Sequence, residues 1–116
     1  MTLFTDRVES GIERALTAVS LRQRVTADNL ANAMTPGYTA QRVDFESSLS
    51  AALEAGRPEA ATPTVVNSTE AAKLDGNNVD VEVEVTEQQR TGLQYSALVE
   101  AANMKLGLLK TAIDGR

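Results

Sequence analysis

The chain has 116 residues, a net charge of −5, no cysteine and no histidine. These features exclude disulfides, thiolate chemistry and the commonest general base and metal ligand, and the interspersed charges lack the basic face of a nucleic-acid-binding protein. Alanine accounts for 17 residues and aromatic side chains for only 4, so we expect a single domain with a thin hydrophobic core.

The first segment, residues 1–34, is predicted to form a long amphipathic helix that begins near Thr5. Its apolar side chains recur at steps of four and three residues, as on one face of a helix, at Val8, Ile12, Ala15 and Val19. Asp6 and Glu9 make a cleaved signal peptide improbable. No stretch reaches the roughly 20 apolar residues of a membrane span, so we expect no membrane insertion.

The helix is predicted to end within NLANAMTPGY, residues 29–38. The residue before a proline avoids the α region, so Thr35 should be extended. Pro36 and Gly37 suit the two central positions of a type II turn, in which glycine supplies a positive φ. Asn32 can hydrogen-bond the exposed carbonyl groups at the helix end.

The middle of the chain, residues 35–78, is predicted to contain this turn, a short extended run near residues 43–45, a short helix and a flexible loop. Asp44 is a candidate N-cap for a helix over about residues 45–55, which Gly56 and Pro58 end. Residues 57–78 are rich in turn formers and small polar side chains, so we expect a linker or a mobile loop there.

The last segment, residues 79–116, carries an unbroken heptad pattern. Steps of four and three residues predict a coiled-coil seam along one long helix, made of Val81, Val85, Gln88, Gly92, Tyr95, Val99, Ala102, Leu106, Leu109 and Ile113. A glycine at seam position 92 costs about 1 kcal/mol against alanine in a helix. That cost is explained if another backbone packs closely against Gly92.

The start of this segment, VDVEVEV at residues 79–85, also has the alternation of a strand. We favour a helix, because Asp80 can serve as its N-cap and Glu82 and Glu84 suit the positive end of its dipole. These carboxylates project in different directions on a helix, so we expect a solvated acidic start rather than a metal site.

The turn motif resembles the signature of the bacterial flagellar axial proteins, with Asp28 where alanine is usual. The matching residues are Asn29, Asn32, Thr35, Pro36, Gly37 and Tyr38. Both terminal segments, around RQRVTADNLANAMTPGY and EVTEQQRTGLQYSALVEAANMKLGLL, resemble the proximal rod protein family of the flagellar basal body, the FlgB type. The short middle segment fits that family better than hook proteins, which carry large inserted β domains.

This resemblance implies a mainly α fold, in which long N- and C-terminal helices pair as a coiled coil around a short loop or extended middle segment. It implies a structural role without catalysis or cofactor, and export through the flagellar type III apparatus without a cleaved signal peptide. The implied partners are copies of the chain, other rod proteins, and the inner-membrane ring with its rod adaptor protein.

The resemblance also gives roles to the motif. Asn29 and Asn32 would bond the loop backbone and neighbouring subunits, whereas the simpler alternative makes them solvated helix residues. Tyr38 would either pack against a neighbour or close its own turn.

The thin core and the two narrow apolar stripes favour an assembly subunit, whose ends gain order when neighbours bury them. The candidate assembly interface comprises Val8, Ile12, Ala15, Val19, Val85, Gly92, Tyr95, Val99, Ala102, Leu106, Leu109 and Ile113. Two alternatives stay open: a free-standing coiled-coil adaptor or export chaperone, and another axial rod subunit.

Overall fold

A computed structural model describes residues 2–115, with side chains from residue 7 onward; Met1 and Arg116 of the predicted terminal segments lie outside it. The elements are, in chain order, α1 (Thr2–Ala31), β1 (Gln41–Asp44), α2 (Glu46–Glu54), a 3-10 helix η1 (Pro58–Ala60), β2 (Thr64–Asn67) and α3 (Val81–Asp114). The molecule is elongated, with extents of 64 × 28 × 14 Å.

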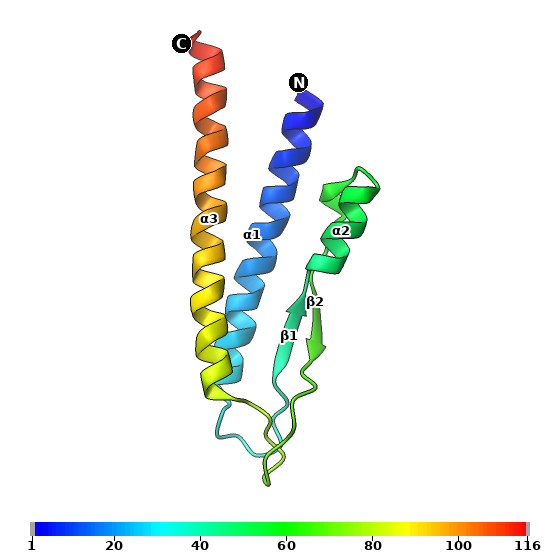
Figure 1. Cartoon of the computed structure of the whole chain (residues 1–116), viewed down its shortest axis with the longest axis vertical. Coiled ribbons are helices and arrows are strands. Elements are labelled where there is room, and N and C mark those ends of the chain that lie inside the picture. Colours follow the sequence, from blue (N-terminus) through cyan, green and yellow to red (C-terminus); the bar gives the residue numbers. More distant parts are fainter. Residues whose placement is uncertain (1, 116) are drawn as a thin grey trace.

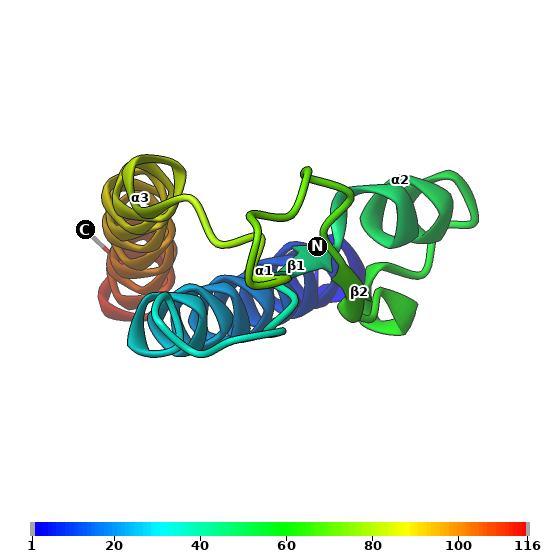
Figure 2. The ribbon, with the colours of Figure 1, turned by 90° about the horizontal axis from the view of Figure 1, so that it is seen from below.

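The two long helices run antiparallel, so the start of α1 and the end of α3 lie at the same end of the molecule (Figure 1). α1 is the central element: α3 packs along one side of it, and the β1–β2 hairpin and α2 lie on the other (Figures 1 and 2). The two helices lie closest where α1 ends and α3 begins, and they diverge toward the termini. The mainly α fold and the packing of the two long helices are therefore confirmed.

The hydrophobic core is as thin as the composition predicts. It lies between α1 and the α2–η1 region and consists of Ala18, Phe45, Ala52 and Ala61, with Ala15 and Leu49 packed at its edge. Three alanines and one aromatic ring bury little apolar area, and buried area sets the stabilisation. Apolar packing alone does not account for how α3 is held.

The predicted helix ends are largely correct. α1 ends at Ala31, after which the Tyr38 N–H donates to the Thr35 carbonyl oxygen at 3.2 Å. Gly37 has φ 75°, which confirms the predicted turn with its positive-φ glycine. At the start of α3, the Asp80 carboxylate accepts from the N–H groups of Glu82 and Val83, so the helix prevails over the strand alternative.

The middle segment holds two corrections. β2 lies inside the stretch predicted to be a linker or mobile loop, and it pairs antiparallel with β1, from Gln41 opposite Asn67 to Asp44 opposite Thr64. Four residues are too few to reveal a strand period, and its partner lies more than twenty residues earlier. Asp44 is also not the N-cap of α2; Phe45 is, with its ring buried and no side-chain capping bond. The Asp44 carboxylate accepts from the Ser47 hydroxyl at 2.7 and 2.8 Å instead.

Candidate functional site

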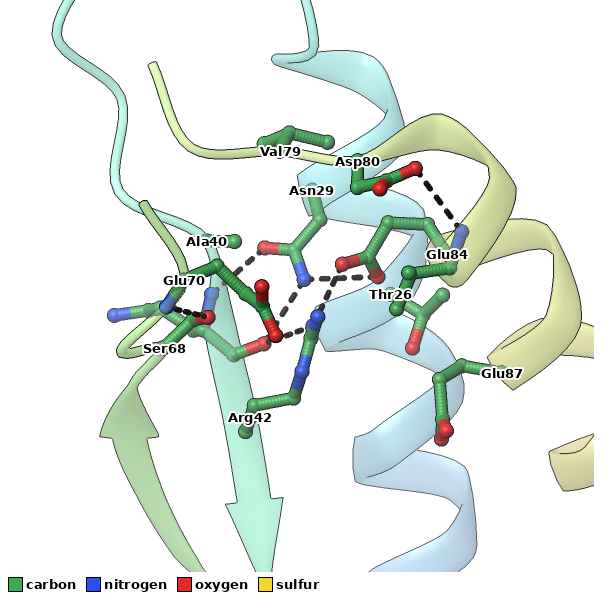
Figure 3. A network of polar contacts seen from close by, with 12 residues as sticks. Thr26, Asn29, Ala40, Arg42, Ser68, Glu70, Val79, Asp80, Glu84 and Glu87 are labelled. Atoms are coloured by element: carbon green, nitrogen blue, oxygen red, sulfur yellow. Dashed lines mark hydrogen bonds and ion pairs between the residues drawn. The ribbon is translucent and has the colours of Figure 1, made fainter. Parts of the chain in front are cut away.

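Asn29, in the last complete turn of α1, joins three elements and is fully buried. Its Nδ2 donates to the Gln41 carbonyl oxygen at 2.9 Å and to Glu84 Oε2 at 3.1 Å. Its Oδ1 accepts from the Gln41 N–H at 3.0 Å and from the Tyr38 hydroxyl at 3.4 Å. Figure 3 shows this amide between α1, β1 and α3. Asn29 thus bonds the backbone of Gln41, at the start of β1, and is not solvated, whereas its bonds to neighbouring subunits stay a prediction.

Asn32 acts locally at the end of α1. Its Nδ2 donates to the Asp28 carbonyl oxygen at 2.9 Å, and its Oδ1 accepts from the Thr35 hydroxyl at 3.1 Å. The Asp28 carbonyl oxygen also accepts from the Asn32 backbone N–H at 3.1 Å, so the side chain adds a second bond to a carbonyl group that the helix already pairs. Pro36 and Gly37 form the exposed tip of the turn.

Two asparagines before α3 also bond the backbone around the turn, and neither was predicted from the sequence. Asn77 is fully buried: its Nδ2 donates to the carbonyl oxygens of Asn32 at 2.9 Å and Thr35 at 2.8 Å, and its Oδ1 accepts from the Val79 N–H at 2.7 Å. Asn78 Oδ1 accepts from the Ala40 N–H at 2.6 Å. We name the set Asn29, Asn32, Asn77 and Asn78 the asparagine clasp.

The clasp ties the segment that leaves α1 to the segment that enters α3. Asparagine suits this task because its amide both donates and accepts, so one side chain satisfies the N–H and C=O groups of a buried loop. The sequence feature that could have pointed to these side chains is the adjacent pair Asn77-Asn78, which lies just upstream of the helix cap Asp80. From sequence alone, Asn67 could equally have been assigned to the clasp, yet it lies exposed at the end of β2.

Two glycines allow the two loops to meet. Gly37 donates its N–H to the Asp75 carbonyl oxygen at 2.8 Å. Gly76 has φ 85°, and a Cβ atom there would lie 3.3 Å from the Gly37 Cα. Any other residue at position 76 would be strained and would press against the turn.

Glu84 is the buried charge of the site. It is fully buried in α3, and its Oε1 accepts from Arg42 Nη1 at 2.6 Å while its Oε2 accepts from Asn29 (Figure 3). The predicted solvated acidic start therefore holds for Asp80 and Glu82 but is wrong for Glu84. Residues two apart point to opposite sides of a helix, and Glu84 lies on the side that faces α1. The described residues contain no carboxylate cluster arranged to bind a metal ion.

The electrostatics at the clasp keep Tyr38 protonated. Burial, followed by the negative charges of Asp28 and Glu84, raises the pKa of the Tyr38 phenol above its usual 10.0. The neutral hydroxyl can then donate to Asn29, so within the chain Tyr38 does close its own turn. Packing of Tyr38 against a neighbour stays a prediction.

A second ion pair anchors α2 to α1. Arg22 Nη2 lies 2.8 Å from Glu46 Oε1 and donates to the Val43 carbonyl oxygen at 2.8 Å. Burial acts to raise the pKa of Glu46, but hydrogen bonds from Arg22 and from the backbone outweigh it and lower that pKa below 4.5.

The predicted interface residues of α1 occupy two environments. Val19 is buried, whereas Val8, Ile12 and Ala15 line an open apolar groove of about 460 Å³. Leu49 and Leu53 of α2 and Leu98 of α3 form much of the rest of its wall.

The predicted residues of α3 divide between exposed and half-buried positions, and Tyr95 lines a shallow hollow with residues of α1. Exposed members are Val85, Tyr95, Leu106 and Ile113, and half-buried members are Gly92, Val99, Ala102 and Leu109. Nothing lies within 4 Å of a Cβ atom placed on Gly92, so no backbone of the described chain packs there. The assembly interface accordingly stays a prediction.

Known proteins are similar to this chain at the residues of the clasp and beyond them. Residues 13–39, which include the turn motif, match the family model described as flagella basal body rod protein. The chain is similar to the flagellar basal body rod protein FlgB of Bacillus subtilis, with 34% identity over 99% of this chain and 98% of that protein. FlgB of Escherichia coli is 33% identical, over 89% of this chain and 91% of that protein.

FlgB of Cereibacter sphaeroides is 31% identical, and the match covers 99% of both chains. These similarities extend over both long helices as well as the clasp that joins them. The chain therefore belongs to the FlgB family of flagellar basal body rod proteins.

Proposed function

We propose that this chain is a structural subunit of the proximal rod of the flagellar basal body, and that it polymerises through its terminal helices. The observation that carries the proposal is the apolar surface left open on α3. Leu106 is 58% exposed and Ile113 83%, both in the half of the helix that diverges from α1. Exposed large apolar side chains that repeat along one face of a helix are typical of a protein interface.

The groove lined by Val8, Ile12 and Ala15 supports a second contact surface, on α1. One molecule would then offer two different apolar surfaces, and contacts between unlike surfaces of identical molecules build rings or helical filaments. We infer that copies of the chain and other rod proteins cover these surfaces. Residues 1–34 and 79–116 would be the assembly helices, and residues 35–78 the connecting segment.

The remaining partners are the inner-membrane ring with its rod adaptor protein, and the type III export apparatus. The chain would reach the periplasmic rod by that route, without a cleaved signal peptide. Among the described residues, no helix is both long and apolar enough to cross a bilayer. The relatives named above are rod proteins, which disfavours the alternative of a free-standing adaptor or export chaperone.

The thin core and the diverging helices support folding on assembly. Fixing the backbone of one residue costs about 1–2 kcal/mol, and the outer turns of α3 bury too little to offset that cost in a lone molecule. We infer that these turns become fully ordered when neighbouring subunits bury Leu106 and Ile113. The subunit would therefore stay soluble before export and polymerise at the growing tip.

Charge placed on the open surface tests the proposal. Val99→Asp and Leu106→Asp should each abolish swimming and leave secretion of the subunit intact, because both side chains lie outside the core. Urea unfolding of the purified variants should be nearly unchanged. Ala101→Asp, exposed on the opposite side of α3, is the matched control and should swim. Swimming by both stripe variants would contradict the proposed interface.

A further inference from the structure

α3 packs against α1 with a polar face. Glu84 and Thr91 are fully buried at this contact. The side-chain oxygens of Gln88 and Gln94 are buried nearby without a hydrogen-bond partner among the described residues. A buried oxygen that has lost its water and gained no donor is destabilising.

An apolar face of the same helix lies one residue away and points outward. Val81 is 48% exposed and Val85 43% exposed, and Gly92 continues the same line. Turning α3 about its own axis by one residue, about 100°, would put Val85 where Glu84 now lies. Hydrophobic burial alone favours that turned arrangement. Another interaction must therefore hold the observed rotation.

The contacts of Glu84 provide that interaction. Its two carboxylate oxygens reach two different elements, Oε2 to Asn29 on α1 and Oε1 to Arg42 on β1, at 3.1 and 2.6 Å. Turning α3 by one residue would carry the carboxylate away from both donors. The guanidinium of Arg42, only 30% exposed, would then lose its carboxylate partner.

We propose that Glu84 is a positioning residue that fixes the rotation of α3 on α1. A buried polar group can set the register of a helix pair because only one arrangement satisfies it, even where apolar residues would be more stabilising. Glu84 thereby keeps the line Val81, Val85 and Gly92 facing outward. This consequence for assembly rests on the proposed function, whereas the rotation itself does not.

Single cysteines test the rotation, because the chain has none of its own. Val85→Cys reports the outward face and Thr91→Cys the buried face; the thiol of the second should react with a soluble disulfide reagent at least about tenfold more slowly, as buried groups do. In a Glu84→Ala background we expect this order to reverse, because Val85 then has more apolar surface to bury than position 84, so Val85 turns inward and Thr91 outward. Glu84→Gln keeps one acceptor oxygen within reach of Arg42 or Asn29, loses only the second bond, and should preserve the original order.

A double variant is the control for misfolding of the single Glu84 variant. Arg42→Leu combined with Glu84→Ala removes both charges and leaves no buried ion without a partner. It should show the same reversal with an unchanged far-ultraviolet circular dichroism spectrum. Original labelling order in both Glu84→Ala backgrounds would overturn the proposal. So would equal, fast labelling at both sites, whether in the otherwise unsubstituted chain or in the double variant.

A swimming assay, compared with the labelling result, distinguishes failure of this inference from failure of the proposed function. If the outward line meets neighbouring subunits, Glu84→Ala cells should lose swimming and Glu84→Gln cells should retain it. Reversed labelling with normal swimming would support Glu84 as the positioning residue and contradict the use of this line in assembly. Unchanged labelling would overturn the positioning role and leave the proposed rod function untouched.

Discussion

The two ends of this molecule are built on opposite principles. At the clasp end, polar side chains are buried and hydrogen-bonded: Asn29, Asn77 and Glu84 are each fully buried. At the terminal end, apolar side chains such as Leu106 and Ile113 are exposed on a helix that has left its partner. The usual distribution of polar and apolar groups is thus reversed. The clasp end is specified by directional bonds within one chain, whereas the terminal end carries apolar side chains that the described residues leave exposed.

Breaking the clasp should have the largest effect on the free subunit. Asn77→Ala leaves the buried Val79 N–H without its partner and removes one of the two donors to each of the Asn32 and Thr35 carbonyl groups. Each buried group left without a partner costs about 1–3 kcal/mol, so we expect the free energy of unfolding to fall by at least that amount. Urea titration followed by circular dichroism measures it.

Asn103→Ala is the control, because Asn103 is exposed in the terminal half of α3. Its unfolding midpoint should match that of the unsubstituted chain. If Asn77→Ala costs no more than Asn103→Ala, the clasp does not specify the fold.

Substituting two glycines of α3 distinguishes effects on the stability of the free subunit from effects on assembly. Gly92→Ala and Gly107→Ala should each stabilise α3 in the free subunit by about 1 kcal/mol, because no described atom outside the adjacent turns of α3 lies within 4 Å of a Cβ atom at either position. Only Gly92 is on the predicted seam, so only Gly92→Ala should impair swimming, by blocking a neighbour's backbone. Equal swimming by the two variants would show that no close approach occurs at position 92.

Acid should release the weaker ion pair, with the smallest effect. The folded-state pKa of Glu46 is lowered, so its stabilising contribution is present at neutral pH and is lost as the pH falls through that pKa, below 4.5. Glu46→Gln should therefore be less stable than the unsubstituted chain at pH 7, and the difference should vanish in acid. The surface variant Glu100→Gln provides the control. A difference between the Glu46 variant and the unsubstituted chain that is independent of pH would contradict this assignment.

Local patterns predicted the local structure well. The heptad steps gave α3, Asp80 its cap, and Pro36-Gly37 the turn, because each depends on neighbours within a few residues. Chain-distant pairing was not predictable in the same way. β2 depends on β1, and the burial of Glu84 depends on Arg42, which lies 42 residues earlier. Nothing in the alternation VEVEV distinguishes the one glutamate that meets an arginine from the one that meets water.

The motif asparagines show the same limit within one site. The sequence pointed to Asn29 and Asn32 because they flank a strong helix stop. It passed over Asn77 and Asn78, whose partners are backbone groups around the turn at residues 32–40. A backbone group carries no side-chain signature, so side chains that serve it look like ordinary loop residues until the fold brings them together.

The placement of both chain ends at one pole has a geometric consequence (Figure 1). The opposite pole is closed by the turn and loops and has no free helix end to extend. A column of such bodies, all aligned alike, has a head and a tail that differ. If copies of the chain stack in this way, as proposed above, the two ends of the stack would present different surfaces to an incoming molecule.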